Sequence, residues 1–306
     1  MTPAGARELA QGLRHVPQLL SLAIEDRIGN AGVESIVSLG LCHTPRLESL
    51  SFPAGCGEEK NGLCGSAGGQ ILAAALAACP ALTRLSVCQN SLGPGGAAAL
   101  AAALPRAAAL AYLDLSSCDV DDAGAAAVAA ALPAMPQLAA LDLSYNELGA
   151  EAVEGLAGAL PRMPGLERLG LARAWLGEVS MGRLARGKLP ALMSLDLSHN
   201  LLGPGGARAL GRLLRGSPLL TSLDVSGTWL QVQGVAALAA GLCGGPAGGA
   251  RAAGLRELGI SSVGGYDRAF TAPLMEVPDH ARPADYSALI RPESTHTHIH
   301  THTHTH

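Results

Sequence analysis

The feature that most constrains this chain of 306 residues is a leucine pattern that recurs along most of its length. The motif L-x-x-L-x-L occurs six times in succession, and its first leucines are separated by 28, 28, 28, 26 and 28 residues. These first leucines are Leu82, Leu110, Leu138, Leu166, Leu192 and Leu220. A fixed period of this length predicts a stack of similar units, each of which buries its apolar face against the next.

Less regular copies extend the pattern in both directions. They begin at Leu19, Leu47 and Leu255, which makes nine expected strand motifs in all. The intervals after Leu47 and after Leu220 are 35 residues, so each contains an insertion. We assign the first insertion to GCGEEK (55–60) and the second to the glycine-rich CGGPAGGARAAG (243–254), which we expect to be a loop.

Each copy is predicted to form a strand, a turn and a helix. In Leu195-Asp196-Leu197 the alternation indicates a short strand whose leucines point inward and whose aspartate points outward. The turn then carries Asn200, which matches Asn90 and Asn146, and we expect these amides to bond backbone groups of the neighbouring turn. Cys118, Ala174 and Thr228 replace the asparagine in the other copies.

The second half of each copy reads as a helix. Pro94 and Pro204 suit a first helical turn. Four residues after the loop leucine every regular copy has a small side chain, which predicts a close approach of the helix to the strand layer; these residues are Gly32, Gly96, Gly124, Ala152, Ser180, Gly206 and Gly234. Prolines then end several helices, at positions 105, 133, 161 and 190.

These residues resemble the leucine-rich repeat family, and the period near 28 with a helix in each copy looks like its ribonuclease-inhibitor-like subtype. The resemblance covers residues 3 to 263 and is also close to the repeat domains of nucleotide-binding immune receptors and of the Ran GTPase-activating protein. It implies an α/β fold, a right-handed solenoid or horseshoe with a parallel sheet on the concave side and helices on the convex side. It also implies a protein that binds other proteins.

The two ends depart from the regular repeat. Residues 3–18 match the helix half of a copy without its strand, so the solenoid (1–263) begins with an incomplete repeat. Residues 264–306 contain four prolines and end in an alternating Thr-His run, so we expect an irregular, mobile tail that is trimmed first by proteases. The histidines of this run could chelate a transition metal, but a low-complexity tract without function is the favoured interpretation.

Composition excludes several classes of protein. The chain is 48% apolar and 15% charged with a formal net charge of -4, which excludes disorder over its whole length. Its acidic balance and dispersed Lys and Arg lack the basic stripe of a nucleic-acid-binding protein. The start lacks a secretory signal, no apolar run is long enough to span a membrane, and the seven cysteines form no C-x-x-C pair. We expect a cytoplasmic protein with free thiols.

Two segments and one column of residues imitate catalytic or cofactor motifs. Residues 182–189 match G-x-x-x-x-G-K but end in leucine, and we expect them inside a helix rather than at a phosphate-binding turn. Residues 93–98 imitate a dinucleotide-binding fingerprint, although the repeat already explains every glycine. The aspartate column Asp114, Asp142, Asp196 and Asp224 could suggest paired carboxylates, in which one pKa of each pair is raised. A structural or interface role is favoured, so we expect no catalytic residues, no cofactor and no metal.

A protein-binding surface remains. We expect a non-enzymatic scaffold, monomeric or part of a larger assembly, that contacts its partner through the concave face and the ascending-turn rim. The candidate partner-binding residues are Arg84, Tyr112, Asp114, Asp142, Tyr145, Arg168, Arg173, Trp175, Asp196, His199, Asp224 and Trp229. Tyr112, Tyr145 and the two tryptophans are expected on one rim, where they would serve as binding hot spots. A second interpretation stays open, in which each tryptophan is buried and fills the gap left by a missing asparagine.

The alternative function comes from the resemblance to the Ran GTPase-activating protein. Such an activator would act on a GTPase at the strand-exit rim, and Arg27, Arg84 and Arg173 are the candidate arginines there. Against it, the resemblance implies a strongly acidic segment after the solenoid, whereas residues 264–306 are rich in proline and histidine.

Overall fold

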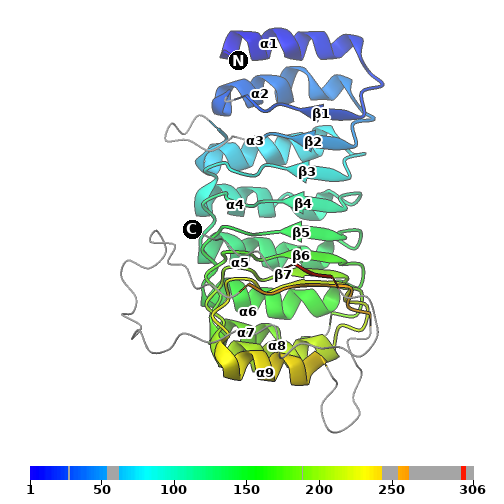
Figure 1. Cartoon of the computed structure of the whole chain (residues 1–306). Coiled ribbons are helices and arrows are strands. Elements are labelled where there is room, and N and C mark those ends of the chain that lie inside the picture. Colours follow the sequence, from blue (N-terminus) through cyan, green and yellow to red (C-terminus); the bar gives the residue numbers. More distant parts are fainter. Residues whose placement is uncertain (27, 54–61, 188, 243–253, 262–297, 301–306) are drawn as a thin grey trace.

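The computed structural model describes residues 1–26, 28–53, 62–187, 189–242, 254–261 and 298–300. Strands and helices alternate along these residues and separate into two layers, with the sheet along one side and the helices along the other (Figure 1). The fold is therefore an α/β solenoid, which confirms the expected class.

The sheet contains short strands of three residues each. They are β1 Ser21–Ala23, β2 Ser49–Ser51, β3 Arg84–Ser86, β4 Tyr112–Asp114, β5 Ala140–Asp142, β6 Arg168–Gly170, β7 Ser194–Asp196, β8 Ser222–Asp224, β9 Glu257–Gly259 and β10 His298–His300. All neighbours pair in parallel and in chain order from β1 to β10. The nine predicted strand motifs are confirmed as β1–β9, and the structure adds β10, which pairs with β9.

The helices cover the opposite side of the sheet. They are α1 Pro3–Gly12, α2 Gly29–Leu39, α3 Gly65–Ala78, α4 Gly93–Ala101, α5 Asp122–Ala131, α6 Ala150–Ala159, α7 Glu178–Leu184, α8 Gly203–Arg215 and α9 Gln231–Leu242. Pro94 and Pro204 occupy first helical turns, as predicted. Pro105, Pro133 and Pro161 each lie in a short 3-10 turn that follows the α-helix, namely η3 Leu104–Arg106, η4 Leu132–Ala134 and η5 Leu160–Arg162. Two further 3-10 turns, η1 Leu13–His15 and η2 Leu41–His43, follow α1 and α2.

One continuous core lies between the two layers. The middle residue of each strand from β2 to β9 is a buried leucine, and these leucines are in register from strand to strand, for example Leu85 with Leu113. The flanking strand residues face away from the core, so the predicted inward and outward positions are confirmed at Leu195, Leu197 and Asp196. Burial of such a leucine row gives each repeat its main stabilising contact with its neighbours.

The small residues at the start of each helix have a different neighbour from the one we predicted. A Cβ atom on Gly206 would lie 2.9 Å from the Cβ of Leu202, and one on Gly96 would lie 2.6 Å from the carbonyl oxygen of Gly65. These glycines therefore make room for the loop leucine four residues earlier and for the helix of the preceding repeat. The prediction of a close approach was correct, but the strand layer is not the partner.

The turn asparagines join consecutive repeats through buried hydrogen bonds. The Asn200 Oδ1 accepts hydrogen bonds from the backbone N–H groups of Ala174 (3.0 Å) and Leu176 (2.9 Å) in the preceding repeat. Its Nδ2 donates to the carbonyl oxygens of Leu171 (2.7 Å) and Leu197 (2.8 Å). Asn146 bonds the repeat of Cys118 in the same way. The predicted ladder is confirmed, and each rung reaches backward along the chain.

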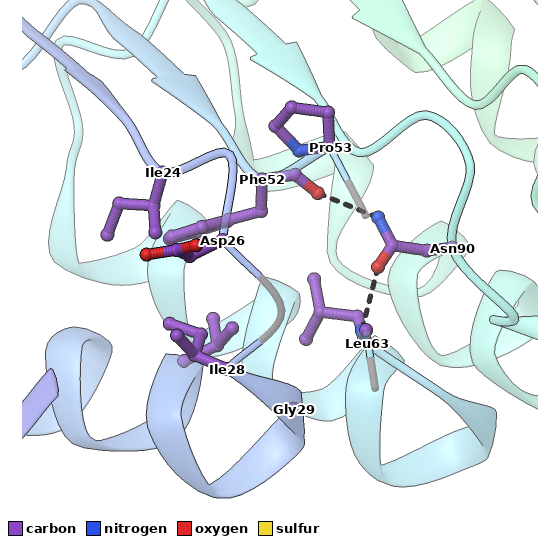
Figure 2. A pocket seen from close by; sticks show the side chains of 10 residues that line it. Ile24, Asp26, Ile28, Gly29, Phe52, Pro53, Leu63 and Asn90 are labelled. Carbon is purple, nitrogen blue, oxygen red and sulfur yellow. Dashed lines mark hydrogen bonds between the residues drawn. The ribbon is translucent and has the colours of Figure 1, made fainter. Parts of the chain in front are cut away.

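Asn90 applies the same geometry to the first insertion, as Figure 2 shows. It accepts a hydrogen bond from the backbone N–H of Leu63 (2.7 Å) and donates to the carbonyl oxygen of Phe52 (2.7 Å). Phe52 and Leu63 lie on either side of residues 54–61, so one asparagine of the following repeat ties the two flanks of the insertion to the solenoid. Residues 54–61 and 243–253 of the insertions, 262–263 at the end of the expected solenoid, and 264–297 and 301–306 of the expected tail lie outside the described residues. The described part of that tail is the strand β10, where the sequence predicted irregular structure.

Candidate functional site

The exposed face of the sheet carries two columns of side chains. The first residues of the strands form one column, which includes Arg84, Tyr112 and Arg168. The third residues form the second column, where Asp114 is in register with Asp142, and Asp196 with Asp224. The guanidinium carbon of Arg84 lies 4.4 Å from the centre of the Tyr112 ring, which is a cation–π contact. Seven of the candidate residues therefore lie on this face: Arg84, Tyr112, Arg168 and the four aspartates.

The aspartates of the second column bond their own turns. Each accepts, through Oδ1, a hydrogen bond from the backbone N–H of the serine two residues later: 3.0 Å for Asp114, 2.9 Å for Asp142, 2.9 Å for Asp196 and 2.8 Å for Asp224. This is an Asx-type turn, which ends the strand and starts the ascending turn. The D-x-S pattern is therefore first of all a structural element.

The glycines in the same column follow from this geometry. A Cβ atom on Gly170 would lie 2.5 Å from the Oδ1 of Asp142, and one on Gly259 would lie 2.5 Å from the Oδ1 of Asp224. Each aspartate thus leans toward the strand that follows it. Because glycine has no Cβ atom, it does not clash with the carboxylate that leans over its strand.

Burial and neighbouring charges change the acidity of this face. Burial raises the pKa of Asp196 above its ordinary value, and the carboxylate of Asp224 adds to the shift, while the hydrogen bonds from Ser198 oppose it. Burial also raises the pKa of Tyr112, with smaller contributions from Asp114 and Asp142. Repulsion between neighbouring aspartates was the expected cause of such a shift. At Asp196 it contributes, but desolvation is the larger cause.

The strand exits form a rim with two rows of residues. We define the inner row as the residues just before the asparagine position: Gln89, Ser117, Tyr145, Arg173, His199 and Gly227. All six have positive φ, between 47° and 68°. A left-handed residue is uncommon for any side chain except glycine and asparagine, so this repeated conformation is a property of the turn and is supported by the surrounding repeats. It places Tyr145 and His199 at exposed positions.

We define the outer row as the residues just after the asparagine position: Ser91, Asp119, Glu147, Trp175, Leu201 and Trp229. Asp119, Trp175 and Trp229 also have positive φ, and they follow the three positions where asparagine is replaced. Trp175 is 56% exposed and Trp229 is 39% exposed, while Ala174 and Thr228 are buried in front of them. The interpretation that each tryptophan is buried in the gap of a missing asparagine was therefore wrong, because both rings are exposed while Ala174 and Thr228 are buried.

Two residues expected at the rim lie elsewhere. Tyr112 and Arg84 are first residues of their strands and lie on the sheet face, at the end of the strand opposite to the rim. The aromatic residues of the rim are thus Tyr145, Trp175 and Trp229, and Arg173 lies over the Tyr145 ring at 5.6 Å from its centre. Arg27 lies outside the described residues. The sequence did not predict three further exposed apolar residues near the rim, Leu201, Val179 and Val232. Leucine and valine usually indicate the core, so their exposure could not be inferred from residue type.

The imitated motifs lie in ordinary repeat positions. Residues 93–98 open α4, and α7 ends at Leu184, so Gly187 lies beyond the helix in which we expected it, and Lys188 is outside the described residues. Within the described ranges, no group of three or more His, Cys, Asp and Glu side chains is placed to hold a metal ion. Burial raises the pKa of Cys79 to about 11 and also raises that of Cys118, which keeps both thiols protonated and weakly nucleophilic.

The described cavities offer little room for a small molecule. A shallow hollow near the first insertion is lined by Ile24, Ile28, Phe52, Leu63 and Asn90 (Figure 2). The side-chain amide of Asn90 already bonds the backbone on both sides of the first insertion. Throughout the part of the chain that the structure describes, every buried side-chain nitrogen or oxygen has a hydrogen-bond partner. Of the helices in that part, none has the length and hydrophobicity needed to cross a lipid bilayer.

Comparisons with known proteins point to repeats. A family model described as Leucine Rich repeat matches residues 110–129, 136–157, 188–211 and 216–239. Comparison with curated proteins returned no match. Among solved structures, a crystal structure of a TLR13–ssRNA13 complex is similar at 20% identity and a TM-score of 0.44, over 81% of this chain and 34% of that one. The tropomodulin C-terminal domain of Caenorhabditis elegans is similar at 14% identity and a TM-score of 0.37, over 60% of this chain and 89% of that one. The chain thus spans about a third of the TLR13 chain.

Proposed function

Because this chain is a leucine-rich repeat protein, we propose that it is a non-enzymatic scaffold that binds a protein partner through its sheet face and its rim. Repeats of this kind generally mediate contacts between proteins. The rigid stack presents side chains at a fixed spacing, which suits recognition of an extended surface. The observation that carries the proposal is the exposure of Tyr145, Trp175 and Trp229 along one rim, in a chain with only eight aromatic residues.

Exposed aromatic residues favour binding for an energetic reason. Tryptophan, tyrosine and arginine are enriched among the residues that dominate binding energy. The rigid rings of tryptophan and tyrosine bury a large apolar area at a small cost in side-chain entropy. Trp175 is 56% exposed and Tyr145 is 52% exposed, so a partner would remove much of their area from water. Arg173, stacked on Tyr145, extends the same surface with a positive charge.

The sheet face supplies the second part of the proposed surface. Arg84, Tyr112 and Arg168 line its first column, and the four aspartates line its second. A partner would meet cationic and aromatic groups on one side of this face and carboxylates on the other. Because the aspartates are already bonded to their turns, they present a fixed arrangement of oxygen atoms rather than mobile charges.

We further propose a cytoplasmic location and the ribonuclease-inhibitor-like subtype. Five cysteines in the described residues are free, which supports a reducing compartment. Repeat intervals near 28 residues with a regular helix in each repeat support the subtype. The net charge of -4 disfavours binding to nucleic acid.

The alternative of a GTPase activator has weaker support. Arg84 lies on the sheet face rather than at the rim, and its guanidinium is stacked on Tyr112. Arg173 belongs to a repeat three positions further along the sheet, so these two arginines do not converge on one point. Acceleration of GTP hydrolysis by a Ran-type GTPase on addition of the purified chain would favour this alternative.

The scaffold proposal is tested by partner capture from the native source, followed by binding of the purified partner. A Tyr145→Ala, Trp175→Ala, Trp229→Ala variant should lose capture while keeping the helix content and the unfolding temperature of the native chain. A matched control changes Val16 and Leu219 to alanine, since both are exposed apolar residues in the turns that precede strands. Undiminished capture by the aromatic variant would contradict the proposed surface.

A further inference from the structure

The outer row changes character along the solenoid. Its first three described members, Ser91, Asp119 and Glu147, are polar or acidic, and its last three, Trp175, Leu201 and Trp229, are large and apolar. Asp119 and Glu147 are exposed, and so are the three apolar residues, Leu201 at 46%. An exposed run of this kind on consecutive repeats is unusual for a soluble surface, which normally scatters its apolar residues.

Backbone hydrogen bonds hold this row together from repeat to repeat. The N–H of Leu201 bonds the carbonyl oxygen of Leu176 (2.9 Å), and Gly177 forms a parallel bridge with Leu201. The N–H of Glu147 bonds the carbonyl oxygen of Val120 (3.0 Å) in the repeat of Asp119. These bonds join the turns of the row in pairs, that of Asp119 with that of Glu147 and that of Trp175 with that of Leu201.

Neighbouring residues strengthen each half of the row. Val179 (70% exposed) and Val232 (53% exposed) lie in the first turns of α7 and α9, four residues after Trp175 and three after Trp229, and add exposed apolar area to these repeats. Glu151, four residues after Glu147 in the first turn of α6, adds a carboxylate to its repeat. Among the described residues, neither Glu147 nor Glu151 takes part in an ion pair.

We propose that the outer row binds a short extended segment of a partner protein that carries Lys or Arg at one end and large apolar side chains at the other. The basic end would lie over Asp119 and Glu147, and the apolar end over Trp175, Leu201 and Trp229. This inference rests on the proposed scaffold function and specifies the chemistry of the segment that the rim takes. Charge complementarity favours this occupant, because the outer row contains Asp119 and Glu147 but no Lys or Arg, and the adjoining Arg173 is stacked on the Tyr145 ring.

The length of the segment follows from the repeat spacing. Neighbouring strands lie about 4.8 Å apart, so the four steps from Asp119 to Trp229 cover roughly 19 Å. An extended chain rises about 3.3 Å per residue, so about six residues are enough to span the row. The outer row of a second copy would bring the same acids without cations to match them, and an anionic membrane would be repelled by the acidic half.

The test is a selection followed by measured binding. A phage library of random twelve-residue peptides is selected on the immobilised full chain, and enriched peptides are synthesised and titrated by fluorescence anisotropy. We expect enriched peptides to combine basic residues with aromatic or aliphatic ones in separate halves. Raising the salt concentration should weaken their binding, because screening acts on the basic end.

Two variants assign the halves of the row. Trp175→Asn with Trp229→Asn should weaken binding at least about tenfold, a change of 1.4 kcal/mol, and asparagine tolerates the positive φ of both positions, so the fold is retained. Asp119→Asn with Glu147→Gln should remove the enrichment of Lys and Arg in a repeated selection but keep the apolar half. The matched control is Val16→Asn with Leu219→Asn, which should bind as the native chain does.

Several results would overturn the inference, and they leave different consequences for the scaffold function. One such result is that the peptides bind the outer-row variants as well as the native chain but no longer bind when Arg84, Tyr112 and Arg168 are changed to alanine. The site would then lie on the sheet face, and the scaffold function would stand. Failure to enrich any peptide, self-association that depends on Trp175 and Trp229, or binding of the chain to vesicles of phosphatidylcholine and phosphatidylserine would each contradict it. If the native chain captured no protein partner at all, the scaffold function would be contradicted as well.

Discussion

Two kinds of repeat alternate in the middle of this solenoid. Those of Asn90, Asn146 and Asn200 carry the buried amide, and those of Cys118, Ala174 and Thr228 do not. The strand layer is the same in both kinds, but the turn differs: a second left-handed residue follows only the replaced positions, at Asp119, Trp175 and Trp229. Because each asparagine bonds the backbone of the repeat before it, one amide serves two repeats, and the repeat without one is free to direct a large side chain outward.

The repeats without asparagine use different side-chain hydrogen bonds in their turns. Thr228 donates its hydroxyl to the carbonyl oxygen of Val225 within the same repeat, whereas Cys118 donates its thiol to the carbonyl oxygen of Val87 in the preceding repeat, at 3.1 Å. At Ala174 no side-chain donor is present, and the backbone N–H is bonded by Asn200. Asn200 thus supplies to the turn of Ala174 the side-chain hydrogen bonds that alanine cannot form.

The strand layer should respond identically in the two kinds of repeat. Leu143→Ala, in the repeat of Asn146, and Leu171→Ala, in the repeat of Ala174, should each lower the free energy of unfolding by about 2–5 kcal/mol through the cavity left behind. Both leucines are fully buried. Chemical denaturation measured by circular dichroism checks this, and a clear difference between the two variants would show that the alternation reaches into the core.

The turns should respond differently. Asn200→Ala leaves two backbone N–H groups and several carbonyl oxygens buried without their partner, so we expect a loss of about 2–3 kcal/mol. Thr228→Ala removes one hydrogen bond and should cost about 1 kcal/mol or less. Equal losses in denaturant titrations would show that the asparagine does not support the preceding repeat.

The sequence predicted the strand layer and the asparagine ladder, but not the alternation. Inward leucines such as Leu195 recur because burial imposes the same requirement in every copy, and periodicity reports that requirement directly. The exposure of Trp175 and the positive φ after each replaced asparagine are properties of the folded turn, which composition does not encode. The backward reach of Asn200 and the lean of Asp142 over Gly170 depend on distances between repeats, which a single copy of the motif does not contain.

Tryptophan emission tests whether the side chains of Trp175 and Trp229 are exposed to solvent. The chain has only Trp175 and Trp229, both in repeats without asparagine, at 56% and 39% exposure. We expect red-shifted emission that acrylamide quenches readily, with little effect of either substitution on stability. Trp175→Phe should leave emission that is less red-shifted and less readily quenched than that of Trp229→Phe. Blue-shifted emission resistant to acrylamide would instead mean that the rings are buried.

The smallest expected effect lies where the two kinds of repeat meet, at Asp196 and Asp224. The pKa of Asp196 is raised in the folded chain, mainly by burial and further by Asp224, so folding disfavours its charged form. Its ionisation therefore lowers stability as the pH rises from its ordinary carboxyl value toward the raised one, and the cost persists at neutral pH.

Asp196→Asn keeps an oxygen to accept the hydrogen bond from the Ser198 N–H and removes the charge. We expect the variant to be slightly more stable than the native chain at pH 7 and to lose this advantage as the pH falls below the ordinary carboxyl range. Thermal unfolding across this pH range measures the difference, and an advantage that grows as the pH falls would show that the charge stabilises the turn.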